Sequence, residues 1–206
     1  MSEARNAGNP PPADDGPGEA ELQPGAEPAP LPEAVLAAPS ALERAEQLVA
    51  LGRLREAVEA FQAAVAAEPE AVPALLGLGS TLLALGQYEA AERELRRALR
   101  IAPTLPEVHY QLGATLFKRA VYPAAAVELR RVVELDPHHP SAYLLLGESL
   151  NQLGEPEGAI EALEHALRVQ PENAKAYYSL GIAYDRRGQP ERAAEMYRRS
   201  REVAAR

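Results

Sequence analysis

The sequence predicts an all-α fold in which pairs of helices stack one after another into a solenoid. One observation is a fixed period: four prolines lie 34 residues apart, at Pro69, Pro103, Pro137 and Pro171. A second is that apolar residues between them recur three, four and seven positions apart, the spacing of one face of an α-helix. A period of this length is typical of stacked helical repeats, which add length without needing one central core.

The period divides most of the chain into five blocks if each block ends two residues after its proline. The blocks are 38–71, 72–105, 106–139, 140–173 and 174–206. Each block is predicted to hold a first helix, a short turn, a second helix and another short turn.

The first helix of each block is predicted to carry a Leu-Gly pair. The pairs are Leu78-Gly79, Leu112-Gly113, Leu146-Gly147 and Leu180-Gly181, with Arg44-Ala45 in the first block. Three positions later comes a large apolar residue: Leu48, Leu82, Leu116, Leu150 and Tyr184. The glycine lets the second helix approach closely, and a larger residue there would cost about 1–3 kcal/mol of stability.

The turn inside each block is predicted from a glycine, which adopts the left-handed conformation at a helix end without strain. The turn glycines are Gly52, Gly86, Gly154 and Gly188. In the third block Ala120 takes this place, and Pro123 predicts that the second helix there starts slightly later.

The second helix of each block is predicted from three further recurring positions. These are an alanine (Ala57, Ala91, Ala125, Ala159, Ala193), a large apolar residue (Phe61, Leu95, Leu129, Leu163, Tyr197) and a small residue (Ala64, Ala98, Val132, Ala166, Ser200). The closing proline ends the helix, because it lacks an N–H and restricts the residue before it.

The Leu-Gly pair, the alanine, the large apolar residue and the proline at this period resemble the tetratricopeptide repeat family. The resemblance covers residues 38–206, although the tryptophan often found early in such a block is absent throughout. It implies a right-handed superhelix with a concave groove lined by the first helices. It also implies a protein that holds another protein rather than a catalyst.

Carried over position by position, the resemblance implies a largely apolar and aromatic groove. The candidate groove residues are Leu76, Leu83, Tyr110, Phe117, Lys118, Leu144, Asn151, Gln152, Tyr178, Asp185 and Arg186. We expect an apolar or amphipathic segment of a partner protein to bind there, with the polar members setting its orientation. An alternative is that Leu76 and Leu144 belong to the core between blocks.

The best-known groove of this family grips a terminal carboxylate with lysine and asparagine one turn apart. The corresponding pairs here are Leu42 with Glu46 and Leu76 with Ser80, and neither can hold a carboxylate. We therefore expect no carboxylate clamp for chaperone tails. The main alternative to an adaptor is a module that assembles with itself. An accessory subunit of an enzyme, or of a secretion or motility complex, would be an adaptor with a specific partner.

The residues do not indicate an enzyme, a metal site or a cofactor. The chain has no cysteine, and no serine lies in a G-x-S-x-G turn. The adjacent His138 and His139 fall in a turn with no further ligand at metal-binding spacing. We interpret His109 as a packing residue.

Charge argues against a nucleic-acid partner. The net charge is −9, of which residues 1–37 carry −6 through seven acidic residues and one arginine. Arg93, Arg96, Arg97 and Arg100 alternate with glutamates, which predicts a solvated, self-paired helix face rather than a basic stripe. No apolar run is long enough for membrane insertion and no secretory signal is visible, so the expected location is cytoplasmic.

Residues 1–37 are predicted to be a disordered tail or tether. They hold eight prolines among Gly, Ala and Glu, a composition that cannot bury enough apolar surface to fold. Within them, residues 31–36 form a short apolar stretch that could cap the first helix or occupy the groove.

Overall fold

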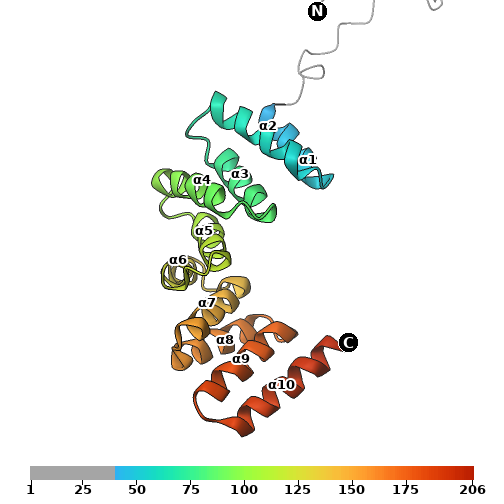
Figure 1. Ribbon diagram of the computed structural model, residues 1–206, viewed down its shortest axis with the longest axis vertical. Coiled ribbons are helices and arrows are strands. Elements are labelled where there is room, and N and C mark those ends of the chain that lie inside the picture. Colours follow the sequence, from blue (N-terminus) through green and yellow to red (C-terminus); the bar gives the residue numbers. More distant parts are fainter. Residues whose placement is uncertain (1–39) are drawn as a thin grey trace, which may run out of the picture. The chain divides into compact units, whose positions relative to one another are not determined.

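A computed structural model describes residues 40–206, which form ten α-helices and no strand (Figure 1). The predicted disordered segment, with its apolar stretch 31–36, lies outside the described residues. The helices are α1 (Ala41–Ala50), α2 (Leu54–Ala67), α3 (Val72–Ala84), α4 (Tyr88–Ile101), α5 (Pro106–Lys118), α6 (Tyr122–Leu135), α7 (Pro140–Leu153), α8 (Pro156–Val169), α9 (Ala174–Arg186) and α10 (Pro190–Ala204). The prediction of an all-α solenoid of helix–turn–helix repeats is confirmed.

The helices stack in chain order, each packing on the helix before it and the helix after it (Figure 1). The first helices also contact one another across the blocks, from α1 to α3, α5, α7 and α9 in turn. Within residues 40–206 no second helix contacts another second helix. The array therefore curves with its first helices on the inner side, which is where a groove can form.

The Leu-Gly pairs place each first helix against the second helix of its own block. A Cβ atom on Gly147 would lie 2.5 Å from Cγ of Leu163, and one on Gly181 would lie 2.5 Å from Cε1 of Tyr197. Both distances are below van der Waals contact, so the close approach requires glycine. Leu163 is completely buried as a result.

The turn glycines adopt the predicted left-handed conformation, with φ between 72° and 75°. Ala120 adopts it too, with φ of 59°, although a Cβ atom makes this conformation unfavourable. The expected later start of the following helix is wrong, since α6 begins at Tyr122, the equivalent of Tyr88 in α4. Pro123 fits in the first turn of α6 because the N–H groups there have no partner within the helix.

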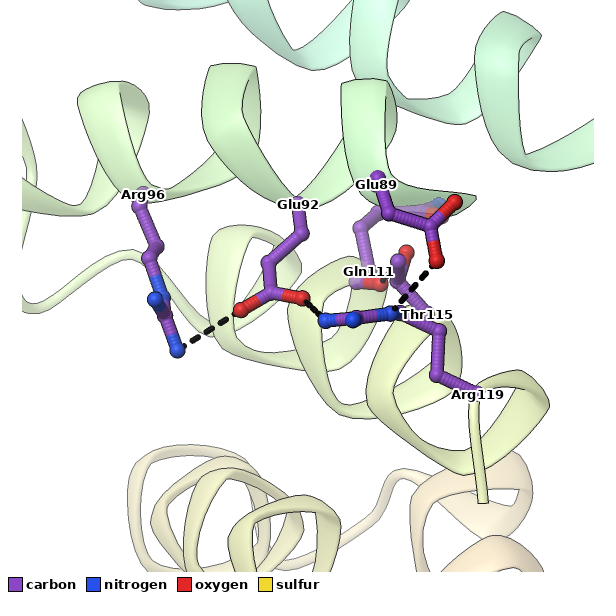
Figure 2. A network of polar contacts seen from close by, with 6 residues as sticks. All are labelled: Glu89, Glu92, Arg96, Gln111, Thr115 and Arg119. Atoms are coloured by element: carbon purple, nitrogen blue, oxygen red, sulfur yellow. Dashed lines mark hydrogen bonds and ion pairs between the residues drawn. The ribbon is translucent and has the colours of Figure 1, made fainter. Parts of the chain in front are cut away.

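A buried carboxylate joins the second block to the third. Glu92 of α4 is 7% exposed and forms ion pairs with Arg119, which follows α5, and with Arg96 at 2.7 Å. Figure 2 shows the Glu92 carboxylate between the two guanidinium groups, while Arg119 also reaches Glu89 at 3.2 Å. The predicted self-pairing of this face is confirmed for Arg96 and for Arg97, which pairs with Glu94 at 2.6 Å, but Glu92 is not solvated as we expected.

None of the helices in residues 40–206 is both long enough and apolar enough to cross a membrane.

Candidate binding groove

The candidate groove residues all lie on first helices, namely α3, α5, α7 and α9. Their exposure differs. Tyr178 is 55% exposed, and Lys118, Gln152, Asp185 and Arg186 are exposed as well. The others are half-buried, except Asn151, which is 3% exposed. Leu76 and Leu144 are half-buried and pack against the core, as the alternative interpretation allowed.

Five of the candidates meet in one hollow of about 320 Å³ between α5, α7 and α9. They are Phe117, Asn151, Gln152, Tyr178 and Arg186. Leu76, Leu83, Tyr110, Lys118, Leu144 and Asp185 do not line it. The hollow is thus limited to the last three first helices.

Four further residues line this hollow: Glu148, Lys175, Ser179 and Ile182. Glu148 and Ile182 lie one helical turn after Leu144 and Tyr178, so their spacing places them on the same helix face. Lys175 precedes Tyr178 by three residues, so these two side chains also share one helix face. Helical spacing is the signal that adds Glu148, Lys175 and Ile182 to the candidates.

A polar network connects α7 to α9 at the floor of the hollow. The side-chain amide of Asn151 donates a hydrogen bond to the backbone carbonyl of Ser179 at 2.9 Å. Glu148 accepts from the Ser179 hydroxyl at 3.2 Å and pairs with Lys175 at 2.9 Å. Asn151 therefore ties two blocks together rather than standing open to solvent.

Each aromatic candidate rests against a second ring from another segment. Tyr110 lies 4.6 Å from the ring of His139, Phe117 lies 5.5 Å from Tyr122, and Tyr178 lies 5.5 Å from Tyr197. These ring contacts restrict the three side chains.

Asp185 is not a free charge. It accepts a hydrogen bond from the hydroxyl of Tyr197 at 2.7 Å, and burial together with this bond raises the pKa of Tyr197 to about 12. Lys118 and Arg186, in contrast, form no ion pair within the part of the chain that the structure describes. Lys118 and Arg186 therefore leave positive charge available to a partner in the groove.

A second hollow, of about 540 Å³, is lined by residues of α4, α5 and α6. It contains none of the candidate residues. At its floor, buried His109 contacts Glu128 at 2.7 Å and the carbonyl of Pro103 at 2.9 Å, and exposed Val127 stands at its edge. His109 is buried as predicted, but it also links three segments.

No group of three metal-ligating side chains occurs within residues 40–206. The features that the groove offers are apolar surface, fixed aromatic rings and a few charges, which suit binding of a polypeptide segment.

Comparison with known proteins places this geometry in a family. No curated protein matches the chain. Tetratricopeptide repeat models match residues 48–115, 110–164 and 139–206, so that together they span both ends of the groove.

Solved structures agree with these matches. A crystal structure of MamA is 28% identical, with a TM-score of 0.73 over 78% of this chain and 94% of MamA. YrrB, described as a TPR protein with an unusual peptide-binding site, is 24% identical, with a TM-score of 0.71 over 79% of this chain and 84% of YrrB. The chain belongs to the tetratricopeptide repeat family.

Proposed function

We propose that this array is a non-catalytic adaptor that binds an apolar or amphipathic segment of another protein in its groove. The observation that carries the proposal is the hollow that Phe117 of the third block lines together with Tyr178 and Ile182 of the fifth. Apolar surface around aromatic rings such as those of Phe117 and Tyr178 is typical of interaction sites, and tyrosine is enriched among residues that dominate binding energy. An extended or helical segment laid across first helices would cover these rings.

The fixed aromatic rings support the proposal. Phe117 and Tyr178 are each held by a neighbouring ring, so little side-chain freedom remains to be lost when a partner binds. Binding to such a preorganised apolar surface costs less conformational entropy than binding to mobile side chains, so more of the buried area contributes to affinity.

The polar residues at the groove would set the orientation of the partner. Lys118, Gln152 and Arg186 occupy the same place in three successive blocks and are all exposed. The two cations have no acidic partner among residues 40–206, so they favour a segment with acidic or amide groups along one edge. The YrrB description gives a precedent for peptide binding by this fold, although its likeness to this chain is in fold alone.

We do not propose a carboxylate clamp. The early groove positions hold half-buried Leu76 and exposed Glu46, and a glutamate repels a terminal carboxylate.

Self-assembly through the ends is less well supported, because polar residues stand at several end positions that are apolar inside the array, although Leu51 is 69% exposed at the first end. At the first end, exposed Arg44 and Gln47 stand where α3 has buried Leu78 and Thr81. At the other end, Arg201 is exposed where α8 has half-buried Leu167. Repeat arrays that end in polar faces resist stacking of further blocks. Light scattering tests this point, and growth of the mass with concentration would favour the self-assembly alternative.

The adaptor proposal is tested by mapping where a selected peptide binds. Peptides selected from a random library would be added to isotope-labelled protein, and the amide signals followed by NMR. We expect the largest shifts on α5, α7 and α9. Shifts confined to the second helices, around Val127 for example, would place the binding surface elsewhere.

A further inference from the structure

His139 occupies the position directly before α7 and caps this helix. Its Nδ1 atom accepts a hydrogen bond from the backbone N–H of Ala142 at 3.2 Å. In the next block Asn173 has the same place and function, accepting from Ala176 at 3.0 Å. Because asparagine caps the next block equally well, capping alone does not require a histidine at position 139.

The ring of the same histidine lies against Tyr110 of α5. The ring centroids are 4.6 Å apart and the planes are inclined by 35°. His139 comes 29 residues after Tyr110 in the sequence, so the contact joins the third block to the start of the fourth. One side chain therefore both begins α7 and supports an aromatic residue of the proposed groove.

Protonation is incompatible with this arrangement. A neutral imidazole keeps one nitrogen that can accept a hydrogen bond, whereas an imidazolium carries N–H groups on both nitrogens and accepts none. The protonated ring would also place a positive charge at the N-terminus of a helix, where the backbone N–H groups already create positive potential. Histidine is the side chain that changes charge between about pH 5 and 8.

The charged and titratable groups around His139 leave this conflict in place. From the turn, the Asp136 carboxylate accepts from the backbone N–H of His138 at 3.1 Å, and His138 itself is exposed. From α5, Glu107 lies one turn before Tyr110 and accepts from Gln111 at 2.7 Å. The first turn of α7 contains no acidic residue.

We propose that His139 makes the groove sensitive to pH. When neutral, His139 caps α7 and holds the ring of Tyr110; when protonated, it leaves the cap and releases Tyr110. In mild acid the candidate groove would then lose the fixed position of one aromatic ring, that of Tyr110. The consequence for partner binding rests on the proposed function, but the switch itself is a property of the unbound array.

The direct test follows the ring signals of Tyr110 by NMR in the full chain with labelled tyrosine, assigned with Tyr110→Phe. As the pH falls from about 8 to about 5, we expect these signals to move with the titration of His139. In His139→Asn, which keeps a cap like that of Asn173, the Tyr110 signals should no longer titrate. In His138→Asn, the matched control, they should titrate as in the wild type. Unchanged titration in His139→Asn, or static Tyr110 signals while His139 titrates, would overturn the proposal.

Thermal unfolding gives a second readout. Loss of a helix cap corresponds to a shift in Tm of about 2–4 °C for a chain of this size. We expect the wild type to lose about that much more than His139→Asn between pH 8 and 5, because only the wild type loses its cap. His139→Phe retains a ring but has no acceptor, so it should be less stable than the wild type at pH 8, and it should lack the extra loss that the wild type shows in acid. Equal pH dependence in all three proteins would refute the switch.

Neither measurement uses a partner. Failure here would leave the adaptor proposal standing, and an adaptor that binds elsewhere would leave the titration of Tyr110 unaffected.

Discussion

The hydroxyl of Tyr197 donates a hydrogen bond to the carboxylate of Asp185 at 2.7 Å, joining the last two helices. In earlier blocks the place of Tyr197 is taken by fully apolar and buried residues such as Leu163. No block covers Tyr197 within the described array, and a tyrosine can fill the contact with Gly181 while its hydroxyl stays hydrogen-bonded.

This bond predicts how stability changes in alkali. The folded chain holds the pKa of Tyr197 at about 12, raised by burial and by Asp185. Because the unfolded chain ionises near the ordinary tyrosine value of about 10, the stabilisation is complete below that pH and is lost as the pH rises toward 12. Tyr197→Phe should lose less stability than the wild type over this interval, as measured by urea unfolding. An identical loss in both proteins would contradict the assignment.

Ala120 predicts a stabilising substitution. It is the only non-glycine residue with positive φ in residues 40–206, and glycine relieves that strain. Ala120→Gly should raise the free energy of unfolding by about 0.5–1 kcal/mol, after the greater freedom of glycine in the unfolded chain is subtracted. Gly86→Ala, at the same place in the second block, should lower it. No gain in the first variant would show that the turn carries no strain.

The close contact between Gly147 and Leu163 predicts that any larger residue at position 147 overpacks the two helices. Gly147→Ala places a Cβ atom 2.5 Å from Cγ of Leu163, so we expect a loss of about 1–3 kcal/mol in chemical unfolding. Gly158→Ala is the matched control, since its Cβ would meet only a terminal methyl of Leu150 at 3.3 Å. Its effect should stay within about 1 kcal/mol, because alanine favours the helix. Equal losses in the two variants would contradict the close approach.

The buried Glu92 predicts strong coupling with Arg119. Arg119→Leu leaves the buried carboxylate with Arg96 alone and should lower the free energy of unfolding. One block later the equivalent pair is Ala126 and Leu153, both apolar. The double variant Glu92→Ala, Arg119→Leu copies that pair and should recover most of the loss. Additive losses in a double-mutant cycle would argue against direct coupling.

The repeating positions made the fold predictable from sequence, because the same small and apolar residues recur wherever helices meet. They also placed the groove candidates on first helices, and five of these residues line one hollow. They did not predict that Asn151 would bond to Ser179, or that Asp185 would bond to Tyr197. Such bonds join side chains of different helices, and their partners depend on how helices pack rather than on the period.

The burial of Glu92 was missed for a related reason. On its own helix the residue alternates with arginines, as solvated residues do. Its equivalent in α8 is the buried, apolar Ile160, and comparing equivalent positions in this way would have indicated the burial of Glu92.

The central claim is tested most directly by the affinity of a selected peptide for a groove variant. The variant is Tyr110→Ala, Phe117→Ala, and the matched control is Val121→Ser, Val127→Ser, which removes exposed apolar side chains away from the groove. With circular dichroism confirming that both remain helical, fluorescence anisotropy should show binding about 100-fold weaker in the groove variant and unchanged in the control. Wild-type affinity in the groove variant, or a loss confined to the control, would contradict the claim.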